Sequence, residues 1–508
     1  LLMLAKVSSA TVVGIDGYPV EVEVDLSSGL PSFDLVGLAD TAVKEAKERV
    51  RAAIKNSGFE FPAHRIVINL APADLKKEGS GFDLPIALGI LCAQGFINPR
   101  VLTSGVFLGE LALDGAIRTV HGVLSMAIAA VRDGKEYLIL PAGNYAEAEV
   151  VKGLKVIPVK SLQEAVEFLQ TGVLPALPDK QVEDEKISSY NEDFADVKGQ
   201  ETAKRALEIA AAGAHNILLV GPPGSGKTML ARRLPSILPE LNWEEALELT
   251  KIYSIAGLLP VGASLLKARP FRNPHHTTSR VGLVGGGRYP RPGEVTLAHH
   301  GVLFLDELPE FSREALEVLR QPLEDGRVTL SRATFSLTYP SRIMLVAAMN
   351  PCPCGYFRDS VHTCSCTPIQ IKRYTSRISG PLLDRMDFMI EVPRLKYEEM
   401  KGVGSAEPSK VIRERVVKAR KIQEARFKGK GHFCNAHMGP REIKHYCSLG
   451  KEAQKLMANA VKNFGISARG YGRLLRVART IADLKEKESL ETLHIAEAIQ
   501  YRGIDKFI

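Results

Sequence analysis

With 508 residues, of which 45% are hydrophobic and 24% charged, the chain has the composition of a soluble globular protein of two to four domains. Its formal net charge of +8 permits an anionic partner such as nucleic acid, although a solvated basic surface explains the charge equally well. The odd number of cysteines, seven, argues against a secreted disulfide framework, and no apolar run is long enough to span a membrane, so we expect a cytoplasmic protein with no membrane partner.

The first predicted unit covers residues 1–172 and mixes strands with helices. The stretch VEVEVD, from Val20 to Asp25, alternates apolar and acidic residues with the period of a half-exposed strand. Asp40 precedes a predicted amphipathic helix that ends at Gly58. The apolar segment LPIALGILCAQG has little polar surface and therefore predicts a helix in the core.

Three further regions follow. Prolines and charges without apolar periodicity predict a linker over residues 173–193. Residues 194–395 again alternate strands and helices, and from residue 396 to residue 508 the pattern is helical. We therefore predict an α/β fold with an α/β N-terminal domain, a core built on a parallel sheet and a C-terminal helical domain.

The segment HNILLVGPPGSGKTML predicts a strand, a glycine-rich loop and a helix, and the loop matches the pattern G-x-x-x-x-G-K-[ST]. Backbone N–H groups of such a loop point at phosphate oxygens; Lys227 should reach the β- and γ-phosphates of ATP, and the Thr228 hydroxyl should bind Mg²⁺. An accidental glycine-rich turn is the alternative, which the flanking strand and helix disfavour. The loop residues are Gly221, Pro222, Pro223, Gly224, Ser225, Gly226, Lys227 and Thr228.

Polar side chains follow two other predicted strands. Asp306 and Glu307 end the apolar run in GVLFLDELPEF, and Asn350 ends the run in RIMLVAAMN. Asp306 could hold Mg²⁺ through water, Glu307 could polarise the attacking water, and Asn350 could position that water or sense the γ-phosphate. Acids at the end of a surface strand and a turn-forming Asn are the alternatives. The combination with a phosphate loop favours ATP hydrolysis.

The segment RISGPLLDRMDF offers Arg385 as a source of positive charge for the transferred phosphoryl group. The alternative is a local ion pair of Arg385 with Asp384 or Asp387. The sequence leaves both open.

Together, these motifs resemble an AAA+ ATPase. The stretches FRNPHHTTSRVGLVGGG, PGEVTLAHHGVLFLDELPEF and LRQPLEDGRVTLSRA, with DVKGQETAKRALEIAAAGAHNILLVGPPGSGKT before them, are similar to its magnesium-chelatase branch. Nearly the whole chain resembles the ComM/YifB family of that branch. The resemblance implies a homo-hexameric ring with ATP and Mg²⁺ between subunits, an AAA+ core over residues 194–395 and a helical lid over residues 396–508.

The resemblance also implies roles for two arginines. Arg385 matches the arginine finger, which acts on the nucleotide of the neighbouring subunit. Arg469, at the start of a predicted helix in GISARGYGRLLRVARTIADL, matches the second sensor position, with Arg476 two turns later as the other candidate. A basic solvated helix face is the alternative for both sensor candidates.

The stretches KKEGSGFDLPIALGI and GELALDGAIRTVHGVLSMAIAA resemble the proteolytic domain of the Lon family. That activity requires a serine nucleophile and a lysine base. The serine position falls at Phe82 or Asp83, the lysine position falls on Leu124, and the nearby Ser80 has no matching lysine. We predict a Lon-like domain over residues 1–172 without peptidase activity, retained for binding or ring assembly.

Basic residues lie in an insertion between the phosphate loop and the acid pair, and in a predicted hairpin, GRVTLSRATFSL. In related motors, such segments face the channel of the ring, where arginines could follow a phosphate backbone without reading its sequence. Structural contacts within the loops are the alternative. The candidate DNA contacts are Arg272, Arg280, Arg288 and Arg332.

Four of the cysteines gather in NPCPCGYFRDSVHTCSC. Cys352, Cys354, Cys364 and Cys366 could bind Zn²⁺ in a tetrahedron, with His362 as a substitute ligand. The spacing differs from the common C-x₂-C, so four reduced thiols in an ordered turn stay the alternative. Zinc would stiffen a loop that has little apolar core.

These observations predict an ATP-driven hexameric motor that acts on single-stranded or branched DNA, as in branch migration during recombination or natural transformation. The residues themselves indicate ATP hydrolysis, whereas the DNA substrate is implied by the resemblance. A chelatase-type ATPase that remodels a protein partner is the main alternative, which the long N-terminal domain and the cysteine loop disfavour. An ATP-dependent protease is a third, which the missing Ser–Lys pair disfavours.

Overall fold

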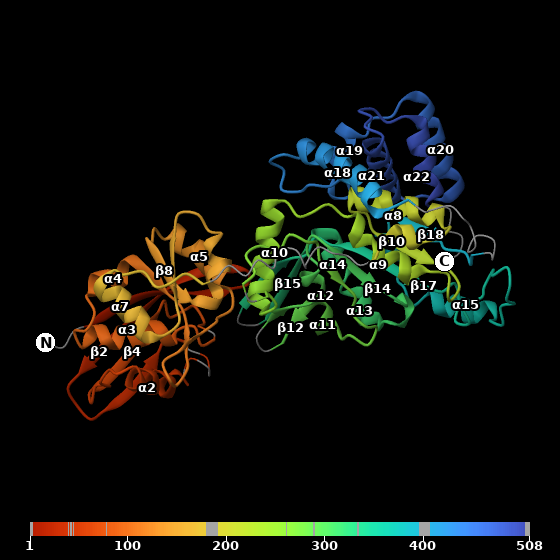
Figure 1. The fold of residues 1–508 in the computed structure, drawn as a ribbon. Coiled ribbons are helices and arrows are strands. Elements are labelled where there is room, and N and C mark those ends of the chain that lie inside the picture. Colours follow the sequence, from red (N-terminus) through yellow and green to blue (C-terminus); the bar gives the residue numbers. More distant parts are fainter. Residues whose placement is uncertain are drawn as a thin grey trace. The chain divides into compact units, whose positions relative to one another are not determined.

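A computed structural model describes residues 4–502 apart from residues 39, 41–42, 44, 78, 179–191, 261, 288–289, 333–334 and 396–406. The chain divides into two compact units, which are labelled by element in Figure 1. The N-terminal unit comprises residues 1–187 and 243–266, and the C-terminal unit comprises residues 188–242 and 267–508. Within the part of the chain that the structure describes, no helix has both the length and the apolar character to cross a membrane.

The N-terminal unit contains a four-stranded sheet in the order β1-β2-β4-β3. β2 lies antiparallel to β1 and β4, and β3 lies parallel to β4. Val20, Val22 and Val24 are buried while the acidic residues between them are partly exposed, which confirms the predicted alternation. The strands are β1 (Ala5–Val13), β2 (Asp16–Ser27), β3 (Ser32–Val36) and β4 (Arg65–Ala71).

A second, parallel sheet in this unit has the order β5-β8-β9, and a short hairpin joins β6 to β7. Every residue of α3 is buried, as the apolar segment predicted. These strands are β5 (Gly105–Phe107), β6 (Glu110–Leu111), β7 (Ile117–Arg118), β8 (Tyr137–Pro141) and β9 (Lys155–Val159). The helices are α2 (Ala46–Asn56), α3 (Asp83–Ala93), α4 (Pro99–Ser104), α5 (Val123–Arg132), α6 (Tyr145–Glu149) and α7 (Leu162–Thr171).

One helix of the N-terminal unit comes from an unexpected part of the chain. α10 (Trp243–Ala256) lies within residues 194–395, which the sequence analysis assigned to the ATPase core, but it packs with α5. The backbone N–H of Gly122 donates to Ser254 Oγ at 2.9 Å, and the Ser254 hydroxyl bonds to the buried carboxylate of Glu147. These buried polar contacts hold residues 243–266 in the N-terminal unit.

The C-terminal unit is built on a five-stranded sheet in the order β11-β14-β17-β10-β18, and every strand pair is parallel. Ile217 and Leu219 of β10 join a core on one face, whereas Leu218 and Val220 join the core on the other. A sheet buried on both faces gives the continuous apolar runs seen in the sequence. The strands are β10 (Ile217–Val220), β11 (Phe271–Arg272), β14 (Val302–Leu305), β17 (Met344–Met349) and β18 (Phe388–Glu391).

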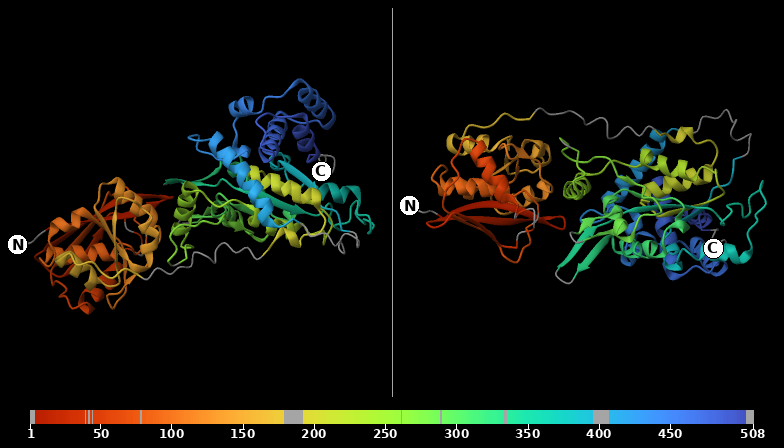
Figure 2. Two further views of the ribbon diagram at one scale, coloured as in Figure 1. Left: turned by 45° about the horizontal axis from the view of Figure 1, so that its top comes forward. Right: turned by 90° about the horizontal axis from the view of Figure 1, so that it is seen from below.

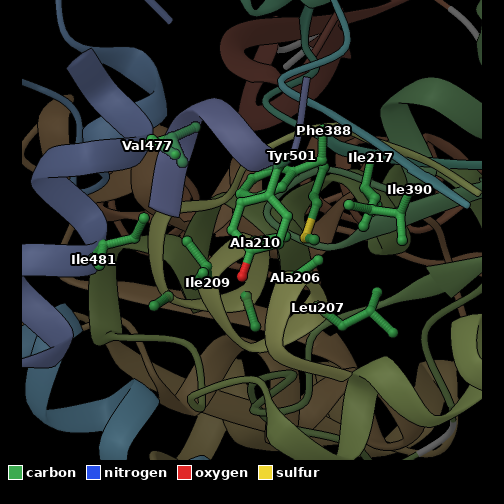
Figure 3. Close-up of a cluster of buried hydrophobic side chains, with 14 of the residues drawn as sticks. Ala206, Leu207, Ile209, Ala210, Ile217, Phe388, Ile390, Val477, Ile481 and Tyr501 are labelled. Atoms are coloured by element: carbon green, nitrogen blue, oxygen red, sulfur yellow. The ribbon is translucent and has the colours of Figure 1, made fainter. Parts of the chain in front are cut away.

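Helix α8 (Glu201–Gly213) lies between this sheet and the C-terminal helices. Figure 3 shows Ala206 and Ala210 of α8 close to Ile217 of β10 and Phe388 of β18, with Ile481 of α21 nearby. The C-terminal helices, coloured blue, gather into one group (Figure 2). They are α18 (Ser409–Arg426), α19 (Pro440–Tyr446), α20 (Lys451–Phe464), α21 (Ala468–Leu484) and α22 (Thr492–Gln500).

The remaining elements surround the sheet. β15 (Arg327–Arg332) and β16 (Phe335–Pro340) form the antiparallel hairpin that the sequence predicted. The helices are α9 (Lys227–Ile237), α11 (Arg280–Val284), α12 (Glu294–Leu297), α13 (Arg313–Glu317), α14 (Arg320–Asp325), α15 (Pro368–Thr375) and α16 (Gly380–Leu383). β12 (Gly285–Gly286) pairs with β13 (Arg291–Pro292), and short 3₁₀ helices span Ala142–Asn144, Phe194–Asp196, Leu308–Glu310 and Asn435–His437.

Candidate active site

The phosphate loop connects the end of β10 to the start of α9. Gly224 and Gly226 have backbone φ angles of 75° and 91°, a left-handed conformation that a residue with a Cβ rarely adopts. Helix α9 begins at Lys227, so its positive dipole end faces the loop. The local sequence therefore builds an anion site here.

Lys227 and Thr228, in the first turn of α9, contact the ends of two other strands. Lys227 Nζ lies 3.2 Å from Asn350 Oδ1 and donates to the carbonyl oxygens of Gly221 and Pro222 at 2.8 and 2.9 Å. Thr228 Oγ1 donates to Asp306 Oδ2 at 2.8 Å. The structure thus brings four residues that the sequence singled out into two direct contacts.

Burial lowers the pKa of Lys227 to about 8, although the negative charges of Asp306 and Glu307 oppose this shift. Among the described residues, the hydrogen bonds of Lys227 go to neutral oxygen atoms. Its positive charge is therefore uncompensated by direct contact, and a triphosphate would supply the missing counter-charge.

Glu307 follows β14 directly and has a left-handed φ angle of 51°, which is uncommon for a residue other than glycine. Its side chain is 59% exposed, and its Oε2 lies 3.5 Å from Nδ1 of His276. An exposed carboxylate at this place can accept a proton from water, and His276 can orient it. The sequence analysis did not assign His276, whose only signal was the histidine pair in FRNPHHTTSR.

These groups all lie at the carboxyl edge of the sheet. β10, β14 and β17 are parallel neighbours, and the phosphate loop, the acid pair and Asn350 follow their last residues. Polar groups at the carboxyl ends of parallel strands form the usual ligand site of such a sheet. The arrangement can hold a triphosphate, a divalent cation and an attacking water.

Arg385 lies at the opposite edge. It precedes β18, which runs parallel to β10 with Phe388 beside Ile217, and Asn216 before β10 donates its side-chain amide to Arg385 O at 3.0 Å. A four-residue strand is about 13 Å long, so the strands separate Arg385 from the phosphate loop of the same chain. Arg385 pairs with Glu324, neither of the two aspartates that the sequence left open.

Arg469 meets Arg385 at this same carboxylate. Arg469, the second residue of α21, has its Nη2 3.8 Å from Glu324 Oε1, and its side chain is 65% exposed. Both arginines line a cavity of about 690 Å³ together with Arg473 and Arg476, whose pKa values are lowered by burial. Buried nitrogen atoms of Arg385, Arg473 and Arg476 have no hydrogen-bond partner within the described part of the chain. Such donors favour an incoming anion.

The N-terminal unit carries hydrophobic and ion-pair contacts at the positions of the Lon-type dyad. Leu124, at the lysine position, is buried, and its backbone N–H donates to Glu147 Oε1 at 2.8 Å. Asp83, at the serine position, pairs with Arg49 through contacts of 2.6 and 3.0 Å. Burial raises the pKa of Asp83 to about 6, opposed by the charge of Arg49. These groups supply an internal ion pair in place of a nucleophile and its base.

The Arg49→Ala variant should lower the free energy of unfolding of the N-terminal unit by about 3 to 5 kcal/mol, because the Asp83 carboxylate, which is 0% exposed, loses its charged partner. Chemical denaturation followed by hydrogen exchange in α2 and α3 measures the change. Lys47→Ala, at an exposed position of the same helix, should stay within about 0.5 kcal/mol of the unmodified chain. A loss no larger for Arg49→Ala than for Lys47→Ala would contradict this prediction.

Among the four candidate DNA contacts, Arg272 is already engaged. Its Nε and Nη2 donate to the two carboxylate oxygens of Glu294 at 2.7 and 2.8 Å. A bidentate pair neutralises the guanidinium, so we no longer assign Arg272 to DNA. The structural contact that the sequence analysis kept as an alternative accounts for this residue.

The other three candidates have different surroundings. Arg280 begins α11 and lines a cavity with Glu324 and Arg385, so it lies beside the arginine pocket. Arg332 ends β15, where it pairs in register with Phe335, and its side chain is outside the description. Arg288 lies outside the described residues.

The four clustered cysteines lie together in the segment after β17. Their sulfur atoms lie within 4.8 Å of one another, and all four are free thiols. His362 is not part of this group, because its Nε2 lies 3.2 Å from Nη1 of Arg394. The structure therefore offers four sulfur ligands and no substitute histidine at this place.

Three family models match the chain. "Magnesium chelatase, subunit ChlI" matches residues 193–400, "Subunit ChlI of Mg-chelatase" matches residues 22–144, and "Magnesium chelatase, subunit ChlI C-terminal" matches residues 406–502. The magnesium-chelatase 38 kDa subunit of Rhodobacter capsulatus is 28% identical over 177 residues, which cover 31% of this chain and 50% of that subunit.

Two relatives match over their full length. Competence protein ComM of Haemophilus influenzae is 44% identical over 511 residues, which cover 100% of this chain and 99% of that protein. The uncharacterised protein YifB of Escherichia coli is 44% identical over 508 residues, which cover 100% of this chain and 98% of that protein. The parallel sheet, the phosphate loop and these matches define a mixed α/β protein of the magnesium-chelatase-like AAA+ class. Within this class, the chain belongs to the family of ComM and YifB.

Proposed function

We propose that this chain is an ATP hydrolase that assembles into a homo-hexameric ring and moves strands of DNA. One observation carries the proposal: the sheet of the C-terminal unit has a phosphate loop at its carboxyl edge and an arginine pocket at its amino edge. Each chain then holds two half-sites that cannot meet within one copy. A closed ring of copies placed head to tail would complete every site.

The arginine pocket supports sharing between copies. Glu324 accepts contacts from both Arg385 and Arg469, and its side chain is 53% exposed. In a ring, the γ-phosphate of the neighbouring copy would replace Glu324 as the partner of Arg385. The guanidinium would then stabilise charge on the transferred phosphoryl group, which is the role of an arginine finger.

The groups at the carboxyl edge have separate roles in this proposal. Lys227 binds the β- and γ-phosphates, Glu307 orients and deprotonates the attacking water, and Asn350 positions that water. The hydroxyl of Thr228 and the carboxylate of Asp306 lie 2.8 Å apart and are oxygen ligands of the kind that Mg²⁺ prefers. When bound, Mg²⁺ would neutralise charge on the phosphates.

The other parts of the chain fit the same machine. We assign the helices from Ser409 to Gln500 to an AAA+ lid, since α21 brings Arg469 into the arginine pocket. We assign the N-terminal unit to a Lon-like domain that has lost peptidase activity and serves binding or ring assembly. The contacts of Asp83 and Leu124 support the loss, because neither position offers a nucleophile or a base.

The DNA substrate rests on three observations of lesser weight. The chain has a net charge of +8, the hairpin of β15 and β16 ends in Arg332, and one relative is named a competence protein. Positive loops can follow a phosphate backbone without reading bases. We therefore propose branch migration or strand displacement during recombination or natural transformation.

Branch migration on forked and four-way DNA tests this function. With ATP, the protein should separate or exchange strands, and the Glu307→Gln variant should bind the same DNA without moving it. Protein that hydrolyses ATP but neither binds nor rearranges any of these DNAs would refute the DNA motor. The match to a magnesium-chelatase subunit favours the second candidate, a chelatase-type remodeller, which would instead retain a protein partner in an ATP-dependent pull-down.

A further inference from the structure

The segment from Asn350 to Cys366 connects the catalytic sheet to a cluster of four thiols. The cluster has the geometry of a single metal ion. Sulfur atoms of Cys352 and Cys354 lie 3.4 Å apart, those of Cys352 and Cys364 lie 3.7 Å apart, and those of Cys354 and Cys364 lie 3.6 Å apart. Four sulfur ligands at about 2.3 Å from one zinc ion stand about 3.8 Å from each other in a tetrahedron.

Other states of the four thiols fit less well. A disulfide brings two sulfur atoms to about 2.05 Å, far shorter than the separations observed. An iron–sulfur cluster places several atoms between its thiolates and needs them further apart. One tetrahedral ion that prefers sulfur, which is zinc in most proteins, matches both the number and the spacing.

Backbone N–H groups surround the sulfur atoms as they do in thiolate sites. The N–H of Phe357 donates to the sulfur of Cys352 at 3.3 Å, and the N–H of Cys354 donates to the sulfur of Cys366 at 3.4 Å. Such bonds stabilise negative charge on sulfur and orient it toward a metal. The segment has little else to order it, since Val361 is 65% exposed and Cys352 is its one buried apolar side chain.

This segment also touches the phosphate loop. A Cβ added to Gly355, the residue after the first cysteine pair, would lie 2.6 Å from Pro223 Cδ, so the backbones meet there without space between them. Asn350 at the start of the segment contacts Lys227. Residues 357–360, between the two cysteine pairs, line a cavity of about 130 Å³ together with Gly221 and Pro222.

We propose that Cys352, Cys354, Cys364 and Cys366 bind one zinc ion, which holds this segment against the phosphate loop and thereby sets the affinity for ATP. The inference rests on the nucleotide site of the proposed function. Without the metal, the segment must become ordered each time a nucleotide binds, and that ordering opposes binding. Zinc then acts as a structural ion with a readout at the active site about one loop away.

The experiment uses the full-length protein. Elemental analysis should find one zinc per chain, and exchange for cobalt should give the thiolate charge-transfer absorption of a tetrahedral site. Cys364→Ser should lose both signals, whereas Ser365→Ala, an exposed neighbour between two of the ligands, should keep them. Removal of zinc by a chelator from unmodified protein should weaken binding of a fluorescent ATP analogue by about tenfold or more, and added zinc should restore it.

The outcomes are distinct. Full recovery on zinc addition supports the proposal and shows that chelation did not unfold the chain irreversibly. Protein that holds neither zinc nor cobalt overturns the metal site, and bound zinc whose removal leaves analogue affinity unchanged overturns the link to ATP. A zinc-loaded Lys227→Ala variant that binds the analogue normally would instead refute the nucleotide site itself, and the inference with it.

Discussion

The Glu307→Gln variant should bind ATP as tightly as the unmodified chain and hydrolyse it about 100 to 10,000 times more slowly, which is the usual contribution of a general base. The amide has the shape of the carboxylate but cannot take a proton from water. Glu307 also has a left-handed backbone and an exposed carboxylate beside His276, a conformation that directs it away from routine surface contacts. Single-turnover hydrolysis and binding of a fluorescent ATP analogue separate the two steps.

Glu310→Gln is the matched control for this variant. Glu310 follows the same strand, but its carboxylate lies 3.0 Å from Nη1 of Arg377 in an exposed ion pair. Loss of such a pair costs little, and turnover should change by less than about threefold. Hydrolysis by Glu307→Gln at the rate of the Glu310→Gln control would show that another group activates the water.

The Arg385→Ala variant should retain ATP binding and lose about 10³- to 10⁵-fold in turnover, as removal of an arginine finger does. The phosphate loop of the variant is intact because Arg385 lies at the other edge of the sheet. Lys227→Ala should fail for the opposite reason, since it removes the contact with the phosphates. Each variant alone is therefore inactive, but in a different half-site.

Co-expression of these two variants tests whether the half-sites belong to different copies. In mixed rings, an intact phosphate loop from one chain lies beside an intact Arg385 from another, so part of the activity should return. If both half-sites acted within one chain, no mixture could restore turnover. Arg377→Ala, a loss of an exposed arginine in the same segment, should leave activity near normal and serves as the control.

Much of the nucleotide site could be predicted from sequence because its signals are local. The phosphate loop needs only a strand, glycines and a helix in succession, and parallel strands bring Asp306 and Asn350 to the edge where that loop lies. The buried helix α3 and the β15–β16 hairpin were likewise readable from apolar runs and turn residues.

Other features depend on contacts between distant residues, and these were missed or left open. Arg385 could pair with adjacent aspartates by sequence alone, but the fold places Glu324 next to it. The contact between His276 and Glu307 joins an insertion to a strand end, and no spacing rule connects them. Arg272 was taken as a free cation because its partner Glu294 is far enough along the chain to give no signal.

Helix α10 has a consequence for any attempt to divide the molecule. Because residues 243–266 belong to the N-terminal unit, the backbone passes from one unit to the other three times. A single protease nick between residues 178 and 192 would leave both halves tethered by two peptide crossings. A fragment that stops at residue 172 would lack Ser254, so the carboxylate of Glu147 would lose a hydroxyl donor that only the distant part of the chain provides.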